Sequence, residues 1–81
     1  MSKAKIISEL LALVEEFLSI EQEYQFAQAR ADAHRDKAIE GDVWERWLYC
    51  GAMLRMLELE ERAHKIENQI NGIEIAISMS E

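Results

Sequence analysis

The sequence contains no proline and only three glycines in 81 residues. Proline breaks helices and glycine weakens them, so their scarcity favours long helices and argues against a loop-rich fold. A single cysteine, Cys50, excludes a disulfide within the chain, which is typical of a reducing compartment. No secretory signal is visible, and the longest stretch without a charged residue, Trp47 to Leu54, is too short to cross a bilayer. We therefore expect a cytoplasmic protein that does not enter a membrane.

Basic residues are also scarce, because nine lysines and arginines stand against sixteen acidic residues and the net charge is −7. Direct nucleic-acid binding is not expected, since phosphate contacts need a basic face. Motifs for chemistry are missing as well: there is no glycine-rich phosphate loop and no Cys/His cluster suited to zinc. Cys50 lies in an apolar stretch that favours a small buried side chain over a nucleophile. We predict that the protein is not an enzyme and has no cofactor.

Two helical patterns fill the chain on either side of residues 40–42. Gly41 suits the left-handed position after a helix end, and Asp42 can cap the next helix. Glu45 stands three residues later, as in a capping box. We predict one domain over residues 1–81, with a helix over about 3–39, a turn at 40–42 and a helix over about 43–77.

Apolar residues recur at helical spacing in both halves. The first stripe comprises Ile6, Leu10, Leu13, Phe17, Ile20, Tyr24, Ala31 and Ala38. It widens around Ile7, Leu11, Val14 and Leu18. The second stripe comprises Leu48, Ala52, Met56, Leu59, Ala63, Ile66, Ile70, Ile73 and Ile77. Folding the chain about Gly41 brings the two stripes together, and the side-chain sizes complement each other, for example Phe17 with Ile66, Ile20 with Ala63 and Ala27 with Met56. This predicts an all-α protein, a long two-helix antiparallel hairpin.

The end of the chain allows two interpretations. Asn71-Gly72 is a turn dipeptide, and apolar residues alternate over 73–79 as in a strand. Ile73 and Ile77, however, continue the helical stripe, and no second strand exists to pair with. A glycine within a helix costs only ~1 kcal/mol. We expect helix to about residue 77.

A second apolar surface lies on the side of the second helix that faces away from the first stripe. Its residues are Val43, Trp47, Cys50, Leu54 and Leu57, with Trp44 and Gly51 beside them. Such an extensive apolar band needs a covering chain. We predict that a second copy covers it, giving a homodimeric four-helix bundle; the alternative is a different protein anchored on the tryptophans.

Acidic side chains concentrate in the half of the hairpin that holds both termini, whereas residues 26–57 carry equal numbers of acidic and basic side chains. The acidic residues that could face a partner are Glu15, Glu16, Glu21, Glu23, Glu58, Glu60 and Glu61. Some of them have lysine or arginine four residues later and could simply support a helix. Otherwise they indicate attraction to a basic protein.

One motif suggests a metal site. Glu61 and His64 form an E-x-x-H, the spacing that places both side chains on one metal in ferritin-like di-iron bundles. In outline the arrangement resembles that of encapsulated ferritins, short two-helix chains that build their site only on dimerisation. By that resemblance the first helix would supply Glu21 or Glu23.

We conclude from the sequence that this is a small acidic protein that acts by protein–protein interaction, as an inhibitor, adaptor or co-chaperone. Its expected shape is similar to that of co-chaperones of type III secretion needle subunits and of phage-encoded inhibitors of host defence. The alternative hypothesis is a dimeric metal-binding bundle that uses Glu61 and His64.

Overall fold

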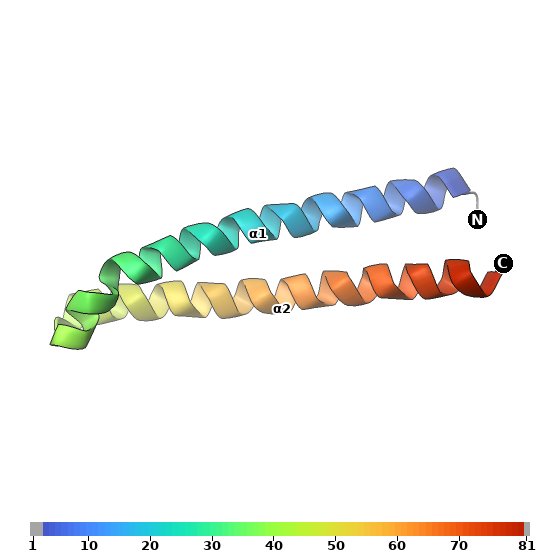
Figure 1. The fold of residues 1–81 in the computed structure, drawn as a ribbon. Helices are drawn as coiled ribbons and strands as arrows, with labels where there is room; N and C mark the ends of the chain where they lie inside the picture. The colour runs from blue at the N-terminus through green and yellow to red at the C-terminus, as the bar shows by residue number, and fades with distance from the viewer. Residues whose placement is uncertain (1–2, 81) are drawn as a thin grey trace.

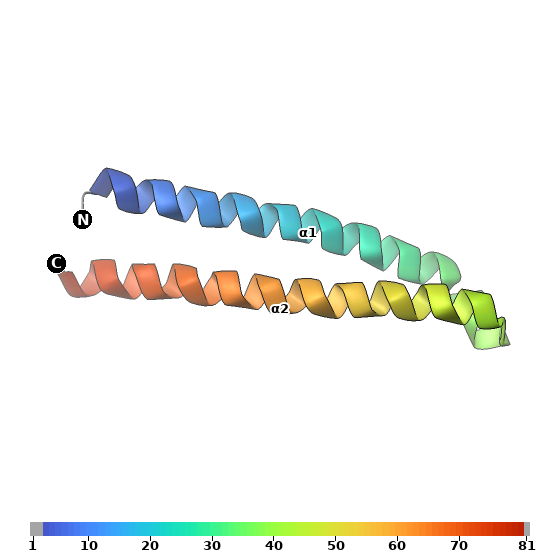
Figure 2. The same ribbon diagram turned by 180° about the vertical axis from the view of Figure 1, so that it is seen from behind.

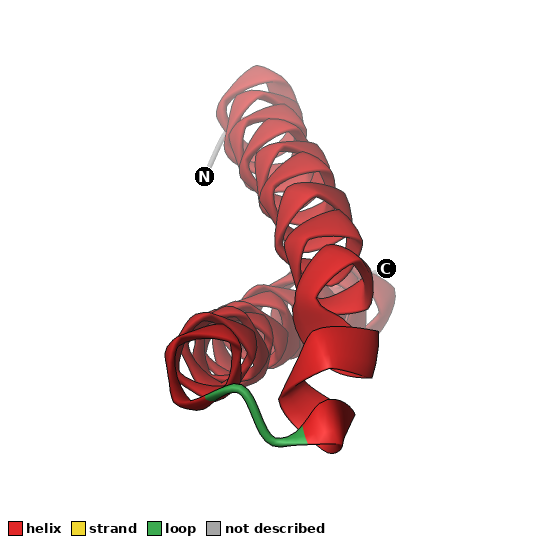
Figure 3. Ribbon diagram, turned by 90° about the vertical axis from the view of Figure 1, so that its left-hand side faces the viewer, coloured by secondary structure: helices red, strands yellow, loops and turns green. Residues whose placement is uncertain are grey.

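The computed structural model describes residues 3–80 and shows two helices joined by a tight turn (Figures 1 and 2). Helix α1 spans Lys3–Glu40 and helix α2 spans Val43–Ser80. They run antiparallel as an extended rod of 59 × 17 × 12 Å, with the first and last described residues at the same end. Seen from the turn, the two helix axes are inclined to each other (Figure 3). The predicted all-α antiparallel hairpin is confirmed.

The C-terminal part of α2 settles the choice between helix and strand. Residues 73–79 are helical, so the strand interpretation is wrong, and α2 continues to Ser80, beyond the predicted end near Ile77. Ile73 and Ile77 are half-buried, whereas Ile75 is exposed. This is the period of a helix with one side against α1.

The turn is a Schellman motif built on a glycine. Gly41 has φ = 105°, a region that side chains with a Cβ rarely adopt. The Gly41 amide donates to the Ala38 carbonyl and the Asp42 amide to the Lys37 carbonyl, both at 3.2 Å. These two bonds satisfy carbonyls that the end of α1 would otherwise leave free.

Asp42 then starts α2, but only half of the predicted capping box forms. The Asp42 Oδ1 atom accepts a hydrogen bond from the Glu45 amide at 3.0 Å. The Glu45 carboxylate does not return to Asp42; it contacts the Nδ1 atom of His34 on α1. The Asp42 amide is already used by the Schellman motif, so Glu45 is free to link the two helices. Arg46 adds a second link, because its Nε donates to the Ala38 carbonyl at 2.9 Å.

The contact between the helices follows a heptad pattern. In α1 the buried and half-buried residues advance by alternating steps of four and three, the mean spacing of 3.5 residues that characterises coiled coils. These residues are Ile6, Leu10, Leu13, Phe17, Ile20, Tyr24, Ala27, Ala31, His34 and Ala38. In α2 the same steps run through Ala52, Met56, Leu59, Ala63, Ile66, Ile70, Ile73 and Ile77. We call this contact the seam.

The residues of the seam are most deeply buried at its middle. Ile20, Ala27, Leu59 and Ile66 form the buried cluster, and only Leu59 is fully buried. The half-buried residues packed against this cluster are Leu13, Phe17, Tyr24, Met56, Ala63 and Ile70. Closer to the turn the buried residues are alanines (Ala31, Ala38 and Ala52), whose small side chains allow the two backbones to approach.

The turn yields a prediction with an internal control. Gly41→Ala should lower the free energy of unfolding by ~1–2 kcal/mol, because alanine is strained at positive φ. Gly72→Ala should raise it by up to ~1 kcal/mol, since Gly72 lies within α2 and its added Cβ meets no atom within 4 Å. Urea unfolding followed by circular dichroism measures both. Equal effects of the two substitutions would show that the turn does not depend on a left-handed residue.

The seam yields a second prediction. Leu59→Ala should destabilise the protein by ~2–5 kcal/mol, the usual cost of truncating a buried leucine. Phe26→Ala removes a larger side chain that is 74% exposed, and should change stability by less than ~0.5 kcal/mol. The same unfolding experiment compares them. A loss below ~1 kcal/mol for Leu59→Ala would mean that the seam does not hold the hairpin together.

Candidate functional site

The two broad faces of the hairpin differ in chemistry. On one face, ion pairs cross from α1 to α2. The Glu23 carboxylate lies 3.1 Å from an Arg55 nitrogen and 3.8 Å from an Arg62 nitrogen. Arg55 also lies 3.4 Å from Glu58. All four side chains are largely exposed, so these pairs contribute little stability, but they give this face both charges.

The opposite face carries a groove between the helices at mid-rod. Tyr24 donates a hydrogen bond from its hydroxyl to Glu60 Oε1 at 3.0 Å. The groove has a volume of about 350 Å³, and its polar lining includes Glu21 from α1 and Glu60 from α2. Within the part of the chain that the structure describes, no basic side chain lines this groove. We call this side the groove face.

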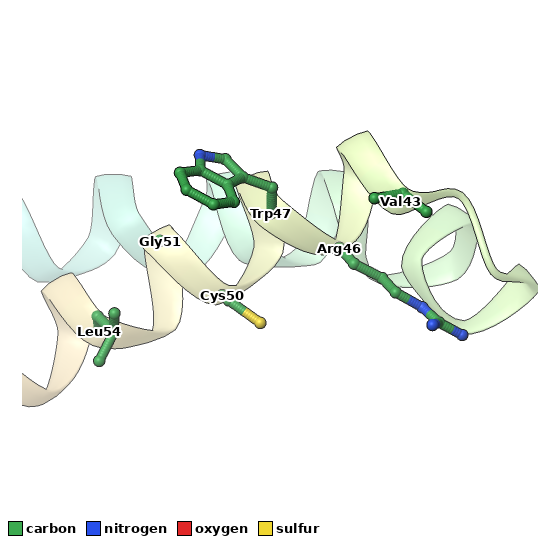
Figure 4. Close-up of a pocket in the computed structure, with 6 residues that line it drawn as sticks. All are labelled: Val43, Arg46, Trp47, Cys50, Gly51 and Leu54. Atoms are coloured by element: carbon green, nitrogen blue, oxygen red, sulfur yellow. The ribbon is translucent and has the colours of Figure 1, made fainter.

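An exposed apolar surface lies on α2 near the turn, on the side away from α1 (Figure 4). It comprises Val43, Trp47, Cys50, Leu54 and Leu57, and we call it the turn-end surface. Trp47 is 73% exposed and Leu54 61% exposed. Between them the small residues Cys50 and Gly51 leave a hollow of about 450 Å³, which Val43 and Arg46 also line. All the described residues that line the hollow belong to α2, and Figure 4 shows α1 passing behind α2.

The structure therefore leaves the predicted apolar residues exposed on the single hairpin. Trp44 is also exposed but does not line the hollow, and Leu57 extends the turn-end surface one step further along α2. Exposure of large apolar side chains on this scale is typical of a surface that meets another molecule.

A second exposed apolar row lies at the other end of the rod, where the sequence shows a widening of the first apolar stripe. Ile7, Leu11, Val14 and Leu18 are between 43% and 59% exposed. We call these four residues the stem row. Each directly follows a seam residue of α1, so each points about 100° away from the seam. Exposure cannot be read from the helical period alone, which is why the sequence did not separate this row from the core.

The acidic residues proposed for a partner do not gather in one patch. Glu23, Glu58 and Glu61 are paired with basic side chains. Glu21 and Glu60 share the groove face, whereas Glu16 lines a different groove, together with Glu9. Glu15 is exposed. The proposed partner-facing carboxylates therefore lie on more than one side of the hairpin.

The predicted metal-binding pair is exposed. Glu61 and His64 follow Leu57 at steps of four and three residues, so they continue the outer row of α2, and Glu61 lies 3.7 Å from Lys65. Within residues 3–80 no group of three or more potential metal ligands comes together. A site using this pair would need ligands from a second copy, and it stays a prediction.

Comparison with known proteins gives no relative. No protein family, no curated protein and no solved structure matches the chain. Neither of the helices described over residues 3–80 has the length and apolar character needed to cross a membrane.

The Tyr24–Glu60 hydrogen bond predicts a shifted titration. Accepting this bond, Glu60 raises the pKa of Tyr24 above its ordinary 10.0, with smaller effects from burial and from the carboxylate charge. The stability that this bond contributes is present below pH 10.0 and is lost as the pH rises through the raised pKa. In a Tyr49→Phe background, ultraviolet titration should show this raised pKa. Glu60→Ala should lower it towards the ordinary value, and Glu61→Ala should not. If the pKa of Tyr24 is already at its ordinary value while Glu60 is still present, the Tyr24–Glu60 hydrogen bond is contradicted.

Proposed function

We propose that the protein functions by binding other proteins, as an inhibitor, adaptor or co-chaperone, and that it does so as a homodimer of hairpins. The observation that carries the proposal is the turn-end surface. Its side chains lie on the opposite side of α2 from the seam, so no movement of α1 could bury both sets at once. A second chain is needed to cover it.

The turn-end surface has the pattern of a surface that pairs with itself. Along α2 its side chains run large, small, large: Trp47, then Cys50 with Gly51, then Leu54. If a second copy of α2 crosses antiparallel at Cys50 and Gly51, Trp47 of each copy stands opposite Leu54 of the other. The large side chains then flank the hollow from both sides. Two-fold interfaces of this kind are the commonest in homodimers.

The charge distribution favours the same arrangement. Residues 26–57 include five acidic and five basic side chains, so two turn-end halves meet without net repulsion. The remaining residues hold all the excess negative charge, and in this arrangement they point in opposite directions. Pairing through the acidic halves would instead bring like charges together. The dimer therefore leaves both acidic ends accessible to a partner.

Leu54→Glu tests the dimer. The native chain should sediment as a dimer at micromolar concentration, and the variant as a monomer, because burying an unpaired carboxylate costs several kcal/mol. Helical content by circular dichroism should be retained, since Leu54 lies outside the seam. Phe26→Glu is the control, because it adds the same charge at an exposed apolar position of α1 outside both apolar surfaces and should remain dimeric.

Two results would contradict the dimer. If the native protein sediments as a monomer at micromolar concentration, it does not form the proposed homodimer. The turn-end surface then becomes the candidate site for binding a different protein. Equal dissociation by Leu54→Glu and Phe26→Glu would show that added charge, rather than the turn-end surface, controls association.

A further inference from the structure

We call the end of the rod away from the turn the open end. We infer that the groove face at the open end of the hairpin is a docking site for a basic amphipathic helix of a partner protein. This inference rests on the proposed function, because it identifies the partner-binding site of a protein that acts by binding proteins. The site has an apolar wall on α1 and an acidic wall on α2. It lies at the opposite end of the rod from the turn-end surface, so a dimer through that surface leaves it accessible.

The apolar wall is the stem row. Ile7, Leu11, Val14 and Leu18 advance by four, three and four residues, which places them in a line about 17 Å long at 1.5 Å per residue. This is three turns of helix, the length over which a docked amphipathic helix presents its own apolar side chains.

The acidic wall follows from the mid-rod groove, where Glu21 of α1 and Glu60 of α2 line the same hollow. Because the seam repeats every seven residues, positions seven residues further along each helix stand in the same relation to it. One repeat towards the open end, Val14 on α1 faces Glu67 on α2. One repeat further, Ile7 faces Glu74. Both glutamates are exposed and lie outside the seam.

Charge selects the occupant. Positions 60, 67 and 74 along the groove face of α2 are all glutamates, and the stem row contains no lysine or arginine. Of the basic residues of this half, Arg62 pairs with Glu23 on the other face, Lys65 lies 3.7 Å from Glu61 on the outer row of α2, and Lys3 and Lys5 precede the stem row at the end of the rod. An apolar strip beside an acidic strip matches a helix with leucines on one side and lysines or arginines next to them. A second copy of this chain fits poorly, since the same region of a second copy is equally acidic.

A peptide of matched chemistry tests the site. The probe is a fluorescein-labelled helix of about 18 residues, with leucines at steps of three and four and lysines along one flank. Its counterpart replaces the lysines by glutamates. Fluorescence anisotropy with the full chain should show saturable binding of the basic peptide that weakens as salt is added, and at least about tenfold weaker binding of the acidic one.

Paired charge reversals locate the site. The double substitution Glu67→Lys and Glu74→Lys should weaken binding of the basic peptide by about tenfold or more. The double substitution Glu9→Lys and Glu16→Lys makes the same change of net charge at the same end of the rod. Because Glu9 and Glu16 line a different groove, this second pair should weaken binding of the basic peptide much less. Leu11→Ser should also reduce binding without changing helical content.

The inference is overturned if the basic peptide does not bind, if both peptides bind alike, or if the two pairs of reversals have equal effects. Sedimentation of the native chain without peptide reports on the dimer separately. A monomer that still binds the basic peptide would contradict the homodimer and support the docking site. A dimer that does not bind the basic peptide would support the homodimer and contradict the docking site.

Discussion

The seam between α1 and α2 is the constraint on which the remaining structure depends. Its buried residues repeat every 3.5 residues along nearly the whole of both helices, so the same side of each helix faces the other from the turn to the open end. The contact is narrow, and among the described residues Leu59 is the one large side chain that is completely buried. A two-helix protein of this size has a marginal core, so a partner chain is an expected source of further stability.

The regular seam also fixes what lies on every other side of the hairpin. Because each position keeps its relation to the seam, one broad face carries the Glu23, Arg55 and Arg62 ion pairs and the other carries the Tyr24–Glu60 groove. Apolar residues outside the seam then fall into two groups at opposite ends of the rod, the stem row on α1 and the turn-end surface on α2. The proposed dimer and the proposed docking site use one group each, so neither excludes the other.

Local signals in the sequence were sufficient for the hairpin. Gly41 marked the turn, and two stripes of matching spacing predicted which sides of the helices meet. The sequence did not predict that Glu45 would contact His34, because that contact depends on the Asp42 amide being used by the Schellman motif. The sequence showed which half of the hairpin carries the excess acidic residues, but not which sides of that half they occupy. Their distribution around the rod depends on how each helix is rotated about the seam, and a count of charges along the chain does not contain that information.

In the proposed dimer a second copy covers the turn-end surface, and Cys50 reports on this contact without any substitution. In the proposed dimer its thiol lies at the crossing point of the two α2 helices. Its reaction with a thiol reagent should be slow at high protein concentration and should accelerate on dilution from about 100 μM to 0.1 μM, as mass action separates the copies. A rate equal to that of the urea-unfolded chain at every concentration would contradict the homodimer.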